Sequence, residues 1–397
     1  MNQISQRIQA LSPSATLAMS QKSAELKAQG VDVINMSVGE PDFNTPDFIK
    51  EAAKKAIDEN FSRYTPVPGY MSLRKSIAAK LLRENNIEFA PEQIVVGNGA
   101  KQELCNVLLA TINPGDEVII PTPAWVSYVE MVKLAEGKPV EVYAGVDQDF
   151  KITPAQLEAA ITPKTRMIML NSPSNPTGSI YSRDDLKGLA DVLAKYPDVM
   201  ILADEIYEHI NFIGEVHSIS EFESVRDRVI IVNGVSKAYA MTGWRIGYMA
   251  GPLAIAKAVT KLQGQYTSGA SSIAQKAAEA AYDGPQDCVR DMRAAFHRRR
   301  DLIVSLAREI PGWVVNEPQG AFYLFPKVDS YIGKSAGDRK ITCSGDYVMY
   351  LLEVAHVACV DGAAFCAPGY MRLSYATSDD NIREAMRRIK EASAKLI

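Results

Sequence analysis

Lys237 and Arg245 lie eight residues apart in the stretch GVSKAYAMTGWRIGY, residues 234–248, among small neighbours. An amine attacks a carbonyl only in its unprotonated form, so a lysine that forms a Schiff base needs a lowered pKa. Burial and a nearby guanidinium both lower the pKa of a lysine amine. The alternative is a surface lysine in a loop, where most lysines are found. The stretch therefore raises the hypothesis of a buried nucleophile, for which the rest of the chain must provide the context.

Asp204 ends the run VMILAD, in which five apolar residues precede the carboxylate. A buried carboxylate is costly without a positive partner, and the protonated ring nitrogen of pyridoxal 5′-phosphate (PLP) is such a partner. Judged on this residue alone, the alternative of an N-cap for a helix beginning at Glu205 is favoured. Tyr207 could donate to the phenolate oxygen of the same ring, or it could be a core aromatic residue.

The stretch VGNGAKQEL places Gly97 and Gly99 at the end of a predicted strand and begins a helix near Ala100. Free backbone N–H groups at the start of a helix bind phosphate. The same glycines begin a G-x-G-x-x-G dinucleotide pattern, in which Gln102 replaces the third glycine. A nicotinamide-dependent dehydrogenase is therefore an alternative with weak support. Asn175, in NSPSNPTG, could donate to a phenolate oxygen or a carboxylate, although the motif alone is typical of a turn.

Six short apolar runs alternate with amphipathic segments through the middle of the chain. Because apolar and polar residues do not alternate within these runs, they indicate strands covered on both faces, and hence a mostly parallel sheet in an α/β domain. Ligands bind at the carboxyl ends of the strands in such sheets. The predicted strands are 93–99, 116–121, 139–143, 165–173, 199–205 and 228–234, with helices such as 100–112, 125–136 and 184–195 between them.

The pattern changes near residue 285, where a long helix at 285–309 is predicted. Shorter strands at 320–326, 357–362 and 371–375 follow, and then a last helix at 379–395. This predicts a smaller α+β domain. We divide the chain into an N-terminal arm that contributes to the small domain (1–45), a large domain (46–284), and an interdomain helix with the small C-terminal domain (285–397).

Composition excludes several classes of partner. The 397 residues carry a formal net charge of −4, so no global field attracts nucleic acid or an anionic membrane. The one dense basic run, His297–Arg300, is flanked by acidic residues and is predicted to be a solvated helix face. Five cysteines without a C-x-x-C pair predict neither a disulfide framework nor a metal site. With no run of eighteen apolar residues, we expect a cytoplasmic protein.

Three motifs in this order and separation, SPSNPTG, ADEIYEH and NGVSKAYAMTGWRIGY, resemble the class I/II aminotransferases of PLP-dependent fold type I. The likeness extends over essentially the whole chain and includes the GEPDF signature of a bacterial aspartate aminotransferase subgroup. It implies a large domain with a mostly parallel seven-stranded sheet, a smaller α+β domain, a PLP cofactor, and a homodimer with shared active sites.

The resemblance implies a role for each motif residue. Lys237 would hold PLP covalently and then move the proton between the substrate α-carbon and the cofactor. Asp204 would pair with the pyridine nitrogen, while Tyr207 and Asn175 would contact the ring oxygen. The phosphate would be held by Arg245 and by the amides of Gly99, Ala100 and Lys101.

Three further assignments follow from the resemblance. Ser236 is a weaker phosphate candidate, because relatives often have a hydroxyl two residues earlier, where this chain has Gly234. Trp125, in PTPAWVSY, would stack on the pyridine ring, although it could also be a core or interface residue. Tyr64, in RYTPVPGY, resembles the tyrosine that reaches the phosphate site of the neighbouring subunit, which makes a homodimer necessary for full activity.

The resemblance also implies a substrate. Arg372, in MRLSY, would bind the substrate α-carboxylate bidentately, with Gly39 against the same end. Trp125 and Asn175 would contact the substrate as well. Lys101 resembles the residue that binds the distal carboxylate of a dicarboxylic substrate; the alternative is a lysine in the first helical turn that faces solvent. We therefore expect aspartate and 2-oxoglutarate as substrates, which would give oxaloacetate and glutamate.

Other functions stay open at this point. Related enzymes aminate prephenate or accept aromatic and neutral amino acids. A non-catalytic PLP-fold sensor, as found in transcription regulators, would need a DNA-binding domain, and residues 1–45 contain no helix-turn-helix with a basic face.

Overall fold

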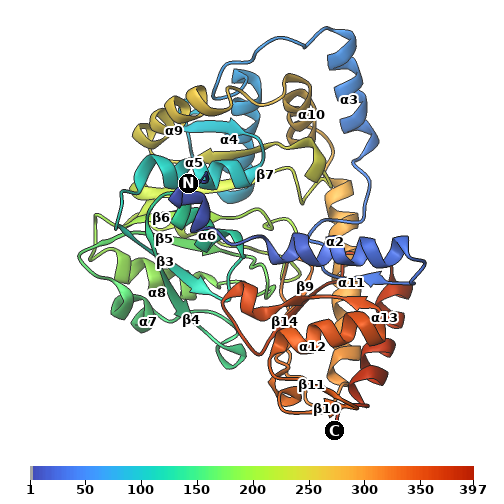
Figure 1. Cartoon of the computed structure of the whole chain (residues 1–397). Helices are drawn as coiled ribbons and strands as arrows, with labels where there is room; N and C mark the ends of the chain where they lie inside the picture. The colour runs from blue at the N-terminus through green and yellow to red at the C-terminus, as the bar shows by residue number, and fades with distance from the viewer. Residues whose placement is uncertain (1–2) are drawn as a thin grey trace.

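The computed structural model describes residues 3–397 and contains a central seven-stranded sheet (Figure 1). The strand order is β2-β8-β7-β6-β5-β3-β4. β8 is antiparallel to both of its neighbours, and the other pairs are parallel. The strands are β2 (Ile94–Gly97), β3 (Glu117–Thr122), β4 (Lys138–Tyr143), β5 (Thr165–Asn171), β6 (Met200–Asp204), β7 (Val229–Gly234) and β8 (Gly247–Ala250).

All six strands predicted from apolar runs are present, and their ends agree within two residues. Alternate side chains of β6 explain why the runs are continuously apolar. Leu202 packs in a core cluster with helices α5 (Ala100–Thr111) and α6 (Ser127–Leu134). Ile201 and Ala203 pack in another cluster with α7 (Pro154–Ala160) and α8 (Arg183–Leu193). Both faces of the strand are therefore buried, as is expected of a parallel sheet. The seven-stranded sheet is confirmed, although the pattern alone did not predict β8.

Helices cover the sheet on both faces and, in the order of the chain, connect its strands (Figure 1). Several have side-chain caps; the Ser182 hydroxyl, for example, accepts a hydrogen bond from the Asp185 amide at the start of α8. The helices up to residue 283 are α1 (Gln6–Gln9), α2 (Ala15–Ala28), α3 (Asp47–Asp58), α4 (Met71–Asn85), α5 (Ala100–Thr111), α6 (Ser127–Leu134), α7 (Pro154–Ala160), α8 (Arg183–Leu193), α9 (Leu253–Tyr266) and α10 (Ser272–Asp283).

The N-terminal segment lies beside the C-terminal part of the chain (Figure 1). β1 (Ile34–Asn35) pairs in parallel with β12 (Val357–Ala358), and the predicted strand 357–362 is divided into β12 and β13. A three-stranded antiparallel sheet has the order β13-β14-β9. The boundaries near residues 45 and 285 stay predictions. The remaining elements are β9 (Tyr323–Leu324), β10 (Ser335–Ala336), β11 (Arg339–Lys340), β13 (Val360–Asp361), β14 (Met371–Ser374), α11 (Asp287–Arg308), α12 (Ser344–Tyr350) and α13 (Asp379–Ser393).

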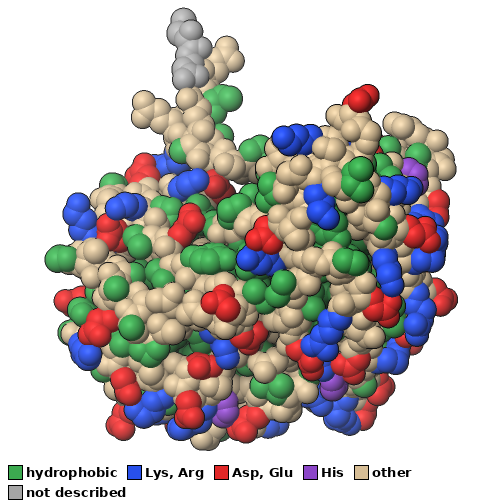
Figure 2. Space-filling view, turned by 90° about the horizontal axis from the view of Figure 1, so that it is seen from below, with side chains coloured by type: hydrophobic (Ala, Val, Ile, Leu, Met, Phe, Trp, Pro, Cys, Tyr) green, Lys and Arg blue, Asp and Glu red, His purple; other side chains and the backbone are tan. Residues whose placement is uncertain are grey.

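The prediction that His297–Arg300 forms a solvated helix face was wrong for two of its arginines. Arg298 is exposed, but Arg299 and Arg300 are each only 8% exposed. Carboxylates compensate this burial, because Arg299 pairs with the distant Asp42 and Asp379, and Arg300 pairs with its neighbour Asp301. Elsewhere, Figure 2 shows positive and negative side chains interspersed over one face. Within residues 3–397, every helix is too short or too polar to cross a membrane.

Candidate functional site

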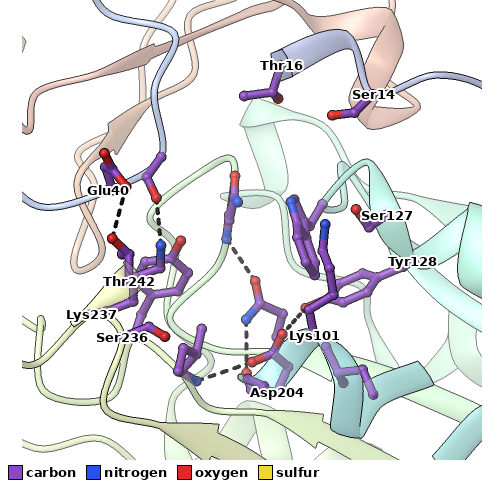
Figure 3. A pocket seen from close by; sticks show the side chains of 18 of the residues that line it. Ser14, Thr16, Glu40, Lys101, Ser127, Tyr128, Asp204, Ser236, Lys237 and Thr242 are labelled. Carbon is purple, nitrogen blue, oxygen red and sulfur yellow. Dashed lines mark hydrogen bonds between the residues drawn. The ribbon is translucent and has the colours of Figure 1, made fainter. Parts of the chain in front are cut away.

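The carboxyl ends of β5 and β6 lie at one cavity of about 460 Å³ (Figure 3). Asn171 and Asp204, the last residues of these strands, are paired in register. The start of α5 and the turn after β7 complete this side of the cavity, and α2 contributes Ser14 and Thr16 from the opposite side. Predicted site residues that line the cavity are Gly39, Ala100, Lys101, Trp125, Asn175, Asp204, Tyr207, Ser236, Lys237, Arg245 and Arg372.

Lys237 projects into this cavity from the turn that follows β7. Its Nζ donates a hydrogen bond of 2.6 Å to the Gly39 carbonyl. Burial lowers the pKa of Lys237 to about 8, and the charge of Glu40 partly opposes this effect. The guanidinium groups of Arg372 and Arg245 lower this pKa further. An appreciable fraction of this amine is therefore unprotonated near neutral pH, which a nucleophile or a general base requires.

This lowered pKa predicts how the reactivity of Lys237 depends on pH. With a pKa of about 8, roughly a tenth of the amine is unprotonated at pH 7, against well below 1% for an ordinary lysine. We expect acetylation of Lys237 in cofactor-free protein, followed by peptide mass spectrometry, to accelerate with pH and level off above about pH 9. Lys54 is exposed and its pKa is raised by Glu51, so its acetylation should still accelerate there. Parallel profiles for the two lysines would contradict the lowered pKa.

Asp204 is a buried carboxylate with a tyrosine as its closest hydrogen-bond donor. The Tyr128 hydroxyl donates to Asp204 Oδ2 at 2.6 Å, and the Ile206 amide donates to Oδ1 at 3.2 Å. Burial raises the pKa of Asp204 to about 6, while these two hydrogen bonds and the Lys237 charge act in the opposite direction. The carboxylate is thus mostly ionised at neutral pH. No helix begins at Glu205, so the N-cap alternative was wrong.

The start of α5 and the Arg245 side chain form a site suited to an anion. Gly99, with φ of +87°, is the N-cap of α5, and a Cβ at this position would collide with the guanidinium of Arg245. Arg245 donates to the Thr242 carbonyl at 2.8 Å and to the Asn98 carbonyl at 3.1 Å. The Gly99 amide already donates to the Gly97 carbonyl. The first-turn amides of Ala100 and Lys101, which have no earlier helical acceptor, are therefore better placed for a phosphate.

Ser236 lines the cavity and is buried, which places its hydroxyl near the residues of this anion site. Two residues earlier, Gly234 lies in β7 opposite Gly247 of β8. A Cβ at residue 234 would lie 2.8 Å from the Gly247 Cα and from the Ile246 carbonyl oxygen. The close approach of the two strands therefore leaves no room for the hydroxyl that relatives often have at this position.

Arg372 is a buried guanidinium without a carboxylate partner in residues 3–397. The side chain is 1% exposed and donates to Asn175 Oδ1 at 3.0 Å and to the Ser37 carbonyl at 2.6 Å. Its Nε has no hydrogen-bond partner, and its Cζ lies 4.5 Å from the centre of the Tyr323 ring. A buried cation is costly without an anion, so this arrangement fits a carboxylate ligand.

Lys101 lies across the cavity from Lys237 (Figure 3), and Trp125 lines the cavity beside Lys101. Lys101 Nζ is 4.6 Å from the centre of the Trp125 indole, and no carboxylate in residues 3–397 forms an ion pair with it. Partial burial and the charge of Arg245 lower the pKa of Lys101. Tyr64, by contrast, is 98% exposed and does not line the cavity. Its predicted contact with a neighbouring subunit stays a prediction.

The structure places several residues at the cavity that sequence reasoning did not assign to it. Tyr128 follows Trp125 by three residues, and only the need of Asp204 for a donor could have indicated it. Asn171 ends β5, and its side-chain amide donates to the Asp204 carbonyl at 2.9 Å. Tyr207 shares a hydrogen bond of 2.8 Å with Tyr323, so its hydroxyl already has a partner in the protein.

The described residues contain one group of side chains that resembles a metal site. Glu84, Glu208 and His209 each offer one ligand atom, and these three atoms lie within 4.8 Å of one another. The buried amine of Lys80, however, forms ion pairs with both carboxylates. Because a lysine already neutralises them, the group is an ion-pair network.

Comparisons with known proteins agree with this geometry. Residues 31–389 match the family model for aminotransferases of class I and II. The chain is 50% identical over 390 residues to an aspartate/prephenate aminotransferase of Nitrosomonas europaea. The aligned region covers 97% of this chain and 98% of that relative. It is also 50% identical over 396 residues to an aspartate/prephenate aminotransferase of Cereibacter sphaeroides, and this aligned region covers 99% of both chains.

Solved structures show the same likeness. An aspartate aminotransferase of Rhizobium meliloti superposes with a TM-score of 0.97 at 43% identity and covers 100% of both chains. An aspartate aminotransferase of Thermus thermophilus, solved with maleate, superposes with a TM-score of 0.92 at 40% identity, over 99% of this chain and 100% of the other.

Proposed function

Because the chain belongs to the class I and II aminotransferase family, we propose that it transfers the amino group of L-aspartate to 2-oxoglutarate, giving oxaloacetate and L-glutamate. One observation carries the choice of a dicarboxylic substrate: Arg372 and Lys101 line the same cavity, and neither pairs with a carboxylate in residues 3–397. Aspartate and glutamate supply two carboxylates, whereas alanine supplies one. The names of the relatives also support aspartate.

We propose PLP as the cofactor, because the chemistry of the cavity fits each part of that molecule. Asp204 is a buried carboxylate that would pair with the pyridine nitrogen, and Lys237 provides an amine for the aldehyde. Arg245 and the first-turn amides of α5 would hold the phosphate. When bound, PLP withdraws electrons from the substrate α-carbon. A nicotinamide-dependent dehydrogenase, the alternative suggested by the glycines before α5, does not agree with this family.

The chain's own residues would then bind, orient and move a proton. The Arg372 guanidinium would hold the α-carboxylate, with one of its edges already fixed by Asn175 and the Ser37 carbonyl. Lys237 Nζ would accept the proton from the α-carbon and return it, which a pKa of about 8 permits. Gly39 leaves room on this side, because a Cβ there would lie 2.7 Å from the Tyr323 hydroxyl.

A second candidate acceptor is prephenate, which the names of two relatives support. Prephenate is also a dicarboxylic keto acid, so Arg372 and Lys101 suit its two carboxylates equally well. Its ring makes it larger than oxaloacetate, and the cavity of about 460 Å³ lies within the usual size range of small-molecule sites.

We further propose a homodimer, in which the exposed Tyr64 of one subunit completes the phosphate site of the other. The proposed domains stay as residues 46–284 for the large domain and residues 285–397 with the N-terminal arm for the small one. All five cysteines are free, which is compatible with the predicted cytoplasmic location.

Replacing Lys101 by alanine tests the proposed substrate. A charged hydrogen bond to the distal carboxylate at a partly exposed site is worth about 1.5–3 kcal/mol, or roughly ten- to a hundredfold in kcat/KM. We expect Lys101→Ala to lower kcat/KM by that factor for aspartate and glutamate and to leave alanine unchanged or improved. Initial rates with the three donors and 2-oxoglutarate give the ratio of aspartate to alanine activity.

Lys101→Arg provides the matched variant, because it keeps a positive charge at the same position. It should retain more of the aspartate preference than Lys101→Ala does. An equal loss for aspartate and alanine in Lys101→Ala would instead assign this lysine to the phosphate site or to the start of α5. The choice of a dicarboxylic donor would then lose its main support.

A further inference from the structure

Residues 36–45 form a segment without helix or strand, and its residues Gly39 and Glu40 line the cavity. Its first residue is fixed on both sides, because the Met36 amide donates to the Ala358 carbonyl and the Ser374 amide donates to the Met36 carbonyl. Farther along, the Ser37 carbonyl accepts from Arg372, and the Gly39 carbonyl accepts from Lys237. Two backbone carbonyls of one segment therefore orient the two cationic side chains on which the proposed chemistry depends.

The far end of the segment is held by the turn that carries Lys237. The Thr45 hydroxyl donates to the Ala240 carbonyl at 2.8 Å and accepts from the Trp244 indole N–H at 3.1 Å. Thr242 donates to Glu40 Oε2 at 2.9 Å, as Figure 3 shows. Apart from these hydrogen bonds, residues 38–44 belong to no helix or strand that would define their position.

Arg299 of α11 attaches the middle of this segment to the helix. Its two terminal nitrogens donate to the two carboxylate oxygens of Asp42 at 2.7 and 3.0 Å, which is a bidentate ion pair. The guanidinium also lies over the Phe43 ring, with its Cζ 5.2 Å from the ring centre. Phe43 packs edge-on against Phe296 of the same helix at 5.5 Å. With the arginine only 8% exposed, water competes weakly for this pair.

We propose that the Arg299–Asp42 pair is a positioning device for the active site. By fixing residues 38–44 against α11, it holds the Gly39 carbonyl against Lys237 and the Ser37 carbonyl against Arg372. Neither Arg299 nor Asp42 lines the cavity, so the pair acts through the backbone between them and the site. The inference rests on the proposed roles of Lys237 and Arg372, but the ordering of the segment is independent of any substrate.

The adjacent arginine offers a matched control. Arg298 also forms a bidentate pair, with Asp379 at 3.0 and 3.2 Å, and it lies on the same helix. It makes no hydrogen bond or ion pair with residues 36–45. Asp379 also lies 3.5 Å from Arg299 Nε, and Arg298→Lys leaves both this carboxylate and the Arg299–Asp42 pair in place. A general contribution of surface charge to stability would affect both arginines, whereas positioning of the segment requires the Arg299–Asp42 pair.

The test compares Asp42→Asn, Arg299→Lys and Arg298→Lys. In cofactor-free protein we expect the amides of residues 36–40 to exchange with deuterium about fivefold faster in the first two variants and at the original rate in Arg298→Lys. Arg299→Lys keeps the charge and loses the bidentate geometry, so it decides the question if Asp42→Asn does not fold. Equal exchange in Arg299→Lys and Arg298→Lys would overturn the proposal.

Kinetics of the cofactor-loaded enzyme provide the second measurement. Per cofactor-containing site, we expect Asp42→Asn and Arg299→Lys to lower kcat and raise the KM for aspartate, with a combined loss of about tenfold or more in kcat/KM. Faster exchange with unchanged kcat and KM would show an ordered segment without a role in positioning, and would also overturn the inference. If the wild type failed to use aspartate, the exchange result would still stand, so the two failures are distinguishable.

Discussion

Replacing Lys237 by alanine is expected to lower the transamination rate by about 10⁴-fold or more, because we assign both the covalent attachment and the proton transfer to this one side chain. The change should leave the phosphate and pyridine contacts in place, since we assign these to Arg245, α5 and Asp204. The variant should therefore still bind PLP, but release it on denaturation even after borohydride treatment. Wild-type protein treated in the same way should retain the cofactor on the peptide that contains residue 237.

Lys237→Arg separates the two properties of the lysine. A guanidinium keeps the positive charge but remains protonated and is not a nucleophile at neutral pH. This variant should be as inactive as Lys237→Ala if the amine itself reacts. Recovery of the reduced cofactor on another lysine, such as Lys101 in the same cavity, would refute the assignment.

The sheet could be predicted from sequence because its strands are buried on both faces and so have an unmistakable apolar composition. β8 was not predicted, since it spans only four residues and two of them, Gly247 and Tyr248, belong to a motif that was interpreted for its chemistry. Its antiparallel direction also depends on pairing with β2 and β7, which no local pattern encodes. The short strand β9 was predicted as seven residues and spans two, because only Tyr323 and Leu324 find partners in β14.

Residues of the candidate site could be predicted where a charged side chain stands within an apolar run of the sequence. Asp204 at the end of an apolar run and Arg372 between Met371 and Leu373 are both polar groups that burial would penalise without a ligand. The hydrogen bond from Tyr128 to Asp204 could not be predicted in the same way. A tyrosine on an apolar helix face violates no rule, and its hydroxyl finds a partner only in the folded chain.

Charge patterning misled the interpretation of α11 for a related reason. Alternating arginines and acidic residues are typical of a solvated helix face. The partner of Arg299, however, is Asp42, which lies 257 residues away. Local sequence contains no sign of this contact, so the basic run could be interpreted only from its neighbours in the chain.

Arg372→Ala is expected to lower kcat/KM by roughly 10²- to 10⁴-fold for every amino donor. Removing one partner of a buried charge pair costs about 3–5 kcal/mol, and the α-carboxylate is common to all donors. The loss should fall mainly on KM, because the carboxylate is bound in the ground state as well as in the transition state. Measurements with aspartate, glutamate and alanine should therefore give a ratio of aspartate to alanine activity close to that of the wild type.

Arg372→Lys and added guanidinium ion distinguish this role from damage to the fold. A lysine offers a single ammonium in place of the planar pair of donors, so it should restore only part of the activity. Guanidinium at low millimolar concentration should partly rescue Arg372→Ala, because it can occupy the space between Asn175 and the Ser37 carbonyl. A collapse of the aspartate to alanine ratio in Arg372→Ala would instead show that this arginine binds the distal carboxylate. The roles proposed for Arg372 and Lys101 would then have to be exchanged.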